Sequence, residues 1–208
     1  MKITYKKGRG DKIHVSVDGE YAFTVDEVYF YSLNLKENAD ITAEELKEIT
    51  LKAGERKAYN YAVSLLSRRE HTVKEITEKL KRKGYGQFCE KVTDRLVSEG
   101  YLSDERFAKL YVRELINLKG YGIRRIRDEL YRKGISREIA EDAMNEAEMP
   151  ENRLKELVEK KYMRYLNDEK GVQKTINALL RSGYSYGEIK DALREIADEN
   201  DIFEVDDE

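Results

Sequence analysis

One stretch of this sequence is written three times, and it decides the fold. The copies read TVKEITEKLKRKGY at residues 72–85, GIRRIRDELYRKGI at 122–135 and GVQKTINALLRSGY at 171–184. The glycine near the end of each copy recurs after 50 and then 49 residues, at Gly84, Gly134 and Gly183. Self-similarity at a nearly fixed period is typical of repeat architectures, in which one supersecondary unit is used several times.

Each copy has the pattern of an amphipathic helix. Val73, Ile76 and Leu80 follow the i, i+3, i+7 spacing that places side chains on one helix face. The same stripe recurs in the other copies as Ile123, Ile126, Leu130 and as Val172, Ile176, Leu179. Basic residues followed by glycine end each copy, which suits the helix dipole and a left-handed C-cap. Thr72 and Glu75 have the spacing of a capping box at the first start.

A further helix is predicted before and after each copy. The leading helices carry the apolar residues Tyr59, Ala62, Val63, Leu66, then Phe107, Leu110, Tyr111, Leu118, then Leu154, Leu157, Val158, Tyr165. The trailing helices carry Phe88, Val92, Leu96, then Ile139, Ala143, then Ile189, Ala192, Leu193, Ile196. Gly100 is predicted to end a helix, and Ser103, Ser136 and Ser185 are predicted N-caps.

These signals predict a mainly α fold of three tandem three-helix repeats at 55–100, 101–149 and 150–208. The third repeat ends in the acidic tail Asp206-Asp207-Glu208. Helices of about 12 residues are roughly 18 Å long, so one repeat buries little by itself. We therefore expect neighbouring repeats to share contacts in an elongated molecule.

The first 54 residues follow a different pattern. Residues 12–25 alternate apolar and polar side chains around Asp18-Gly19, a dipeptide that favours a β-hairpin turn. Ile3 to Tyr5 can supply a third strand. Short helices are expected near 26–33 and at 43–52, the second after a capping box of Thr42 and Glu45. This predicts a small β-hairpin-containing N-terminal segment.

Composition limits the function classes. The formal net charge is −3, but it is −1 over residues 1–57, +3 over 58–149 and −5 over 150–208. The basic excess in the middle is too small to predict strong nucleic-acid binding by itself. The single cysteine, Cys89, the absence of an apolar signal segment and the lack of any 18-residue apolar run predict a cytoplasmic protein without a membrane segment.

Few residues are suited to catalysis. His14 and His71 have no second histidine or cysteine at ligand spacing, and Cys89 reads as a small buried residue without a partner base. We expect no catalytic residue, no metal and no cofactor, and hence a protein that binds another macromolecule. The tyrosines at the predicted helix junctions, including Tyr85, suit packing first and base stacking second.

Basic clusters in the first two repeats are the candidate contact residues. They are Arg68, Arg69, Lys81, Arg82, Lys83, Arg124, Arg125, Arg127, Arg132 and Lys133. Solvated helix ends stabilised by the dipole would explain half or more of them. The alternative is a basic strip that meets a phosphate backbone or an acidic protein surface.

The chain resembles the RecX family of bacterial regulatory proteins over essentially its whole length. The resemblance rests on AYNYAVSLLSRREHTVKEITEKLKRKGY (58–85), on EGYLSDERFAKLYVRELINLKGYGIRRIRDELYRKGI (99–135) and on the echo at 171–184. The string from Tyr101 to Ala108 is its most specific part. The β-hairpin start looks like the extension of longer members from low-GC Gram-positive bacteria.

The resemblance implies a non-enzymatic modulator of the RecA recombinase. Family members lodge in the groove of the RecA–DNA filament and restrain its ATP hydrolysis, strand exchange and co-protease activities, usually as inhibitors. The chain is then expected to act as a monomer with RecA as its protein partner. Contact of the basic strip with single- or double-stranded DNA would be auxiliary and sensitive to salt.

Two alternatives remain open at this stage. Tri-helical units with an Arg-rich helix also suit a DNA-binding protein in its own right, with one helix in the major groove. Against this, the chain is net acidic and Asp128 and Glu129 lie beside the arginines. The other alternative is a scaffold or adaptor that binds some other partner through its helical faces.

Overall fold

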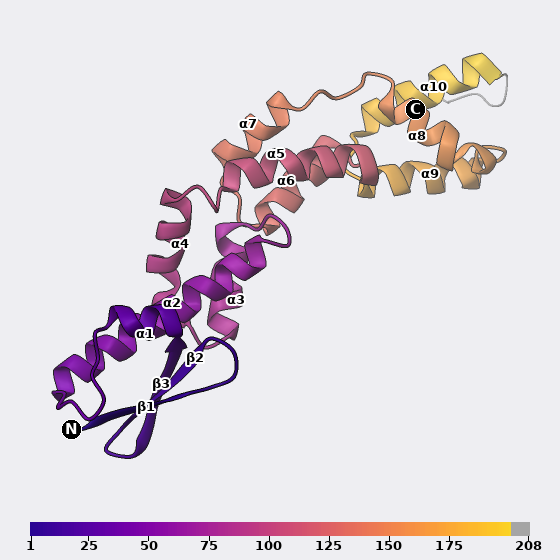
Figure 1. The fold of residues 1–208 in the computed structure, drawn as a ribbon. Helices are drawn as coiled ribbons and strands as arrows, with labels where there is room; N and C mark the ends of the chain where they lie inside the picture. The colour runs from indigo at the N-terminus through magenta and orange to yellow at the C-terminus, as the bar shows by residue number, and fades with distance from the viewer. Residues whose placement is uncertain (201–208) are drawn as a thin grey trace. The chain divides into compact units, whose positions relative to one another are not determined.

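The computed structural model describes residues 1–200, with side chains through residue 198. The acidic tail from Asp206 to Glu208 lies outside the described residues. The chain divides into two compact units, of which the first is Met1–Leu102 and the second begins at Ser103. Figure 1 shows the order of the elements, and it confirms a mainly helical chain that begins with a small sheet.

The N-terminal sheet has three antiparallel strands in the order β1-β2-β3 (Figure 1). The strands are β1 (Ile3–Lys7), β2 (Lys12–Val17) and β3 (Glu20–Asp26). Asp18 and Gly19 connect β2 and β3 with φ of 49° and 88°. Positive φ at both positions is what a two-residue hairpin turn needs. The predicted hairpin and third strand are therefore confirmed.

The helix expected at 43–52 and the leading helix of the first repeat form one continuous helix. The short helix α1 (Glu27–Ser32) comes first, and α2 then runs from Ala43 to Leu66, with the predicted capping box at Thr42 and Glu45. It passes without a break through Gly54. A Cβ at Gly54 would lie 2.7 Å from the Phe88 ring, so the glycine makes room for that ring instead of ending the helix.

Three helices form each repeat, as predicted. The second half of α2 leads the first repeat, followed by α3 (Val73–Arg82) and α4 (Cys89–Ser98). The second repeat holds α5 (Asp104–Glu114), α6 (Ile123–Arg132) and α7 (Arg137–Glu146). The third holds α8 (Arg153–Lys161), α9 (Glu169–Arg181) and α10 (Tyr186–Asn200). Each repeat has its own cluster of buried apolar residues, around Leu80, Leu130 and Leu179.

The repeated glycines end the middle helices in the same way. Gly84, Gly134 and Gly183 have φ of 86°, 84° and 93°, in the left-handed region. The next residue in each repeat donates its backbone N–H to the carbonyl five positions back, for example Tyr85 to Leu80 at 2.9 Å. This is the hydrogen bond of a Schellman motif, so the predicted left-handed caps are confirmed.

Some residues expected on apolar helix faces are exposed. Leu110 is 51% exposed and Leu118 is 75% exposed, and Ile123 and Tyr165 are also exposed. Leu118 lies in a π-helical turn, Leu115–Lys119, that follows α5. Because a π-helical turn has wider spacing than an α-helix, it shifts the phase of the apolar stripe and turns Leu118 to solvent. Within residues 1–200, no helix has both the length and the apolar character needed to cross a bilayer.

Candidate partner-binding surface

The basic residues of the first repeat lie at two helix ends. Arg68 and Arg69 follow the C-terminus of α2, and Lys81, Arg82 and Lys83 close α3; all five are exposed. Because α3 has 10 residues, the charges at its C-terminus lie about 15 Å from its start, where Arg69 binds. The first repeat therefore presents two separate basic groups instead of one strip.

Four of these five cations are available for a partner. Arg68, Lys81, Arg82 and Lys83 make no ion pair with another described residue. The fifth, Arg69, donates from Nη1 to the Glu75 carboxylate at 3.0 Å. Positive side chains at a helix C-terminus are stabilised by its dipole, which explains their place without requiring a partner.

Glu75 joins Arg69 to a buried histidine. The Nδ1 atom of His71 lies 2.7 Å from Glu75 Oε2, and the His71 side chain is almost fully buried. Burial lowers the pKa of His71 below its ordinary value, although Glu75 acts in the opposite direction. The neutral imidazole is therefore favoured in the folded chain. The sequence placed His71 at a helix start but did not predict its burial.

Carboxylates within the second repeat neutralise most of the Arg-rich helix α6. Glu129 Oε1 accepts from Arg125 Nη2 at 2.8 Å and from Arg132 Nη1 at 3.2 Å. Arg127 reaches Glu141 on α7, with Nε 2.9 Å from Oε1. These arginines hold α6 to its own turns and to α7, so their charge is not freely available to a partner.

The two remaining basic residues of the second repeat differ from each other. Arg124 is exposed and has no ion pair with any residue that the structure describes. Lys133 is half-buried, with its Nζ 5.6 Å from the centre of the Tyr111 ring. Among the predicted contact residues of the second unit, Arg124 is therefore the one that is exposed and makes no ion pair with a described residue.

The second and third repeats are joined by backbone contacts and by a partly buried arginine. Arg153 Nη2, at the start of α8, donates to the carbonyls of Ile116 and Tyr121, each at 2.8 Å. The Ile116 carbonyl lies within the π-helical turn and the Tyr121 carbonyl follows it, so Arg153 satisfies acceptors that the widened backbone leaves unpaired. No sequence pattern predicts this role, because Arg153 is one of many charged residues at helix starts.

Two glycines allow the same two repeats to approach closely. The N–H of Gly122 donates to the carbonyl of Ser182 at 2.8 Å, and a Cβ at Gly122 would lie 2.5 Å from the Gly183 carbonyl. The Tyr184 hydroxyl donates to the Gly120 carbonyl at 3.2 Å, and burial raises the pKa of that hydroxyl. Hence the expected sharing of contacts is present between the second and third repeats.

Among residues 1–200, no group of three or more His, Cys, Asp or Glu side chains is arranged to hold a metal ion. Cys89 is buried, and its thiol lies 3.6 Å from the Thr77 carbonyl, so it packs as a small core residue, as predicted.

Family models match all three repeats. The model of the RecX first three-helix domain matches residues 58–101, that of the second matches 103–144 and that of the third matches 150–193. The chain is 33% identical over 192 residues to the regulatory protein RecX of Caldanaerobacter subterraneus subsp. tengcongensis, covering 90% of this chain and 95% of the relative. It is 32% identical over 208 residues to the regulatory protein RecX of Clostridioides difficile, covering 97% and 98%.

Solved structures agree with these matches. A crystal structure of regulatory protein RecX superposes with a TM-score of 0.70 at 28% identity, over 91% of this chain and 97% of that chain. The structure of RecX from Lactobacillus salivarius gives a TM-score of 0.61 at 29% identity, over 69% and 96%. Because the domain models span more than half of the chain and both relatives exceed 30% identity over most of it, the chain belongs to the RecX family of regulatory proteins.

Proposed function

We propose that this chain regulates a RecA recombinase by binding the RecA–DNA filament, and that binding restrains ATP hydrolysis, strand exchange and co-protease activity. The observation that carries the proposal is membership of a regulatory family across all three repeats. The resemblance stated above supplies RecA as the partner. No enzymatic step of the chain itself is required.

The arrangement of the repeats supports binding at several places. Each repeat has its own core, so each can present an exposed face to a different protomer of a filament. Several weak contacts on one chain raise the overall affinity by multivalency. A repeat protein therefore suits a partner that is itself repetitive.

The contact residues are proposed to fall into two classes. The freely charged ones, which we expect to touch the partner directly, are Arg68, Lys81, Arg82, Lys83 and Arg124. The engaged ones, which we expect to shape the surface more than to bind, are Arg69, Arg125, Arg127, Arg132 and Lys133.

Direct reading of DNA by α6 is the weaker alternative. Arg125 and Arg127 are held by carboxylates of the same repeat, and Asp128 on the same helix is exposed. An exposed carboxylate repels phosphates, and arginines that are already paired with carboxylates have little charge left to attract them. We therefore assign to DNA an auxiliary part in filament binding.

A salt series separates the two functions. Binding of the full chain to single-stranded DNA, to duplex DNA and to RecA filaments on single-stranded DNA would be measured while ATP hydrolysis is followed. We expect filament binding to persist at salt concentrations that abolish binding to bare DNA, together with slower hydrolysis. Equal loss of both kinds of binding, with unchanged hydrolysis, would contradict the proposal.

Charge reversal tests the proposed contacts. We expect the triple variant Lys81→Glu, Arg82→Glu, Lys83→Glu to bind filaments at least about tenfold more weakly, because like charges then face the partner surface. The matched control reverses Lys6, Lys36 and Lys47, three exposed lysines of the same unit without ion pairs in the described chain. Equal weakening by both variants would show that only net charge matters.

A further inference from the structure

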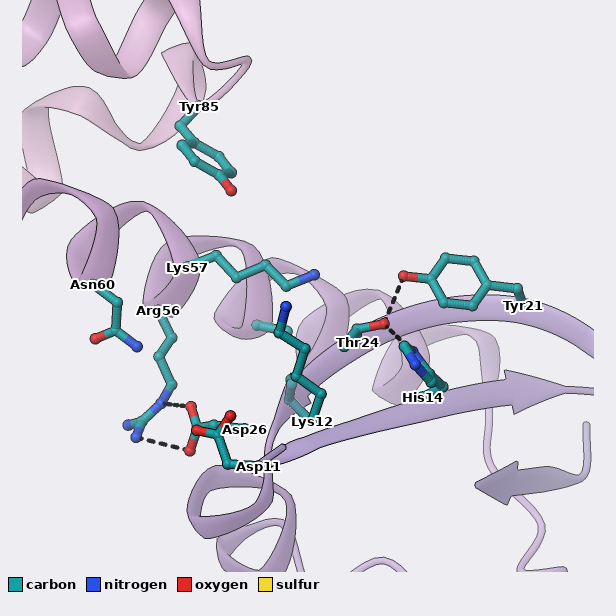
Figure 2. Close-up of a pocket in the computed structure, with 12 residues that line it drawn as sticks. Asp11, Lys12, His14, Tyr21, Thr24, Asp26, Arg56, Lys57, Asn60 and Tyr85 are labelled. Atoms are coloured by element: carbon teal, nitrogen blue, oxygen red, sulfur yellow. Dashed lines mark hydrogen bonds and ion pairs between the residues drawn. The ribbon is translucent and has the colours of Figure 1, made fainter. Parts of the chain in front are cut away.

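A cavity of about 540 Å³ lies in the first unit. It is lined by residues of strands β2 and β3, by the middle of α2 and by Tyr85, and the core residues Val25 and Ala53 form part of the lining (Figure 2). This volume is in the range of pockets that hold small molecules or single groups of larger ones. The hydrophobic core lies on one face of the sheet, where Ile13, Val15 and Phe23 are buried.

One charged pair in the cavity is already closed. Arg56 donates to Asp26 through Nε at 2.6 Å and through Nη2 at 3.1 Å. Asp26 also accepts from the N–H of Tyr29 as the cap of α1. Burial opposes its charge, but the bonds from Arg56 and Tyr29 hold the pKa of Asp26 below its ordinary value. Arg56 and Asp26 therefore maintain the fold and leave no free charge for a ligand.

Two lysines supply the free charge of the cavity. Lys12 comes from β2 and Lys57 from α2, and neither makes an ion pair with another described residue. In Figure 2 the Lys57 side chain runs along α2 towards the sheet, while the Lys12 side chain rises from the strand towards the helix. Asp11 lines the rim and is exposed. Two cations that line one cavity and make no ion pair with a described residue attract an anion into it.

Two tyrosine rings border the same cavity. The Tyr21 hydroxyl lies 3.0 Å from Thr24 Oγ1, which is also 2.7 Å from His14 Nδ1, so the ring is held at its tip. Tyr21 is nevertheless 63% exposed. Tyr85 points its hydroxyl towards the cavity in Figure 2, and that hydroxyl has no hydrogen-bond partner among the described residues. Aromatic faces beside cations are the usual elements of sites for single-stranded nucleic acids.

We propose that this cavity binds a phosphodiester of single-stranded nucleic acid between Lys12 and Lys57, with neighbouring bases against Tyr21 and Tyr85. A single strand is favoured over a duplex because only unstacked bases can reach tyrosine faces. It is favoured over an acidic peptide because carboxylates would use the lysines but not the rings. The two lysines of this site are not among the proposed filament contacts, although Tyr85 lies two residues after Lys83, and binding at this site needs no RecA.

Binding to DNA alone tests this site. Anisotropy of a fluorescein-labelled oligothymidylate of about 20 nucleotides would be measured with the full chain across a salt series. We expect Lys12→Gln, Lys57→Gln to bind about tenfold more weakly. The slope of log affinity against log salt should fall by about 1.4, because each single-strand phosphate contact contributes about 0.7. An unchanged affinity and slope would overturn the proposal.

A matched control and a ring variant separate charge from stacking. Lys36→Gln, Lys47→Gln removes two exposed lysines of the same unit that do not line the cavity, and it should leave binding unchanged. Tyr21→Leu should weaken binding about fivefold or more with an unaltered salt slope, because stacking carries no charge. If both double-lysine variants lost the same affinity for the oligothymidylate, the strand would be attracted by overall charge, and the proposed site would be overturned.

Crosslinking and competition identify the ligand. Irradiation with an oligothymidylate containing 5-bromodeoxyuridine should crosslink peptides that hold Tyr21 or Tyr85. Crosslinks confined to other peptides would overturn the proposal.

Thymidine monophosphate and inorganic phosphate should compete only weakly at equal phosphate concentration, and so should polyglutamate. Competition as strong as that of the strand would instead assign the cavity to a small phosphate ligand or to an acidic protein segment.

Discussion

The equivalent middle helices of the first and second repeats differ in how far their basic side chains are paired. Helices α3 and α6 both carry an apolar stripe, a run of basic residues and a left-handed glycine. At the end of α3, Lys81, Arg82 and Lys83 are exposed without ion pairs to described residues. On α6, Arg125 and Arg127 are paired with Glu129 and Glu141. A count of charges in the sequence therefore overestimates the charge that the second repeat offers to a partner.

The glycines that end the middle helices also differ in the space around them. No described atom lies within 4 Å of the position that a Cβ would take at Gly84. At Gly183 that position is 2.4 Å from the backbone nitrogen of Arg125. One motif thus ends a helix in the first repeat, and in the third it also forms the contact with the second.

The largest expected effect separates these two glycines. Gly84→Ala should lower the free energy of unfolding by about 1–2 kcal/mol, the cost of a left-handed alanine. Gly183→Ala should cost about 3–5 kcal/mol, because the methyl group also meets the Arg125 backbone and overpacks the contact. Urea unfolding followed by circular dichroism would measure both. Similar losses for the two variants would mean that the contact between the repeats is easily relaxed.

A somewhat smaller effect is expected from the partly buried Arg153. Arg153→Met should cost about 2–3 kcal/mol, because the carbonyls of Ile116 and Tyr121 lose their donor. Arg137→Met is the matched control, since Arg137 is exposed and has no ion pair within residues 1–200. The control should change stability by less than about 0.5 kcal/mol. If both variants unfold at the same urea concentration, Arg153 does not join the repeats energetically.

Acid should affect the first repeat through His71. The folded state lowers the pKa of His71, so between the folded and unfolded pKa values the unfolded chain binds more protons. Its stabilisation is present above the unfolded value of about 6.5 and is lost as the pH falls towards the folded value. The wild type should lose more stability between pH 7.5 and pH 5.5 than His71→Asn does. Parallel pH profiles would argue against this role.

The equivalent positions in the second and third repeats are Tyr121 and Lys170, so neither of these repeats has a histidine there. Hydrogen exchange followed residue by residue should therefore place the acid-sensitive loss of protection in the first repeat. A loss spread evenly over α6 and α9 would contradict this assignment.

The smallest expected effect compares two neighbouring arginines of α6. Arg127→Gln should lower stability by about 0.5 kcal/mol, since its ion pair with Glu141 is partly exposed and screened by water. Arg124→Gln should leave stability unchanged, because Arg124 has no such pair in the described chain. Thermal unfolding at low and high salt would separate them, and a salt-independent difference would exclude the ion pair as its cause.

Local signals explain what the sequence predicted well. The three repeats, the hairpin at Asp18-Gly19 and the glycine caps depend on residues that are close in the chain, so their patterns are visible in the sequence. The unbroken course of α2 was not predicted, for the opposite reason. Gly54 lies inside this helix, and its surroundings depend on the ring of Phe88, 34 residues away.

The candidate surface was predicted less completely because charge pairing is tertiary. Arg127 and Glu141 belong to different helices, and only their packing brings the two side chains together. The cavity lined by Lys12 and Lys57 has the same origin, since these lysines belong to a strand and a helix and lie 45 residues apart in the sequence. Sequence patterns identified which residues are basic, but not which of them are already neutralised.

The contact between Gly122 and Gly183 bears on how this chain can be divided into fragments. By sequence the second repeat ends near residue 149, yet a fragment cut there would lack Arg153, Ser182 and Gly183. The π-helical turn would then keep its widened backbone without the side chain that satisfies it. The smallest fragment that retains every hydrogen bond of the second repeat therefore extends into the third. The family models divide the chain into three repeats, but we expect the second and third repeats to fold as one cooperative unit.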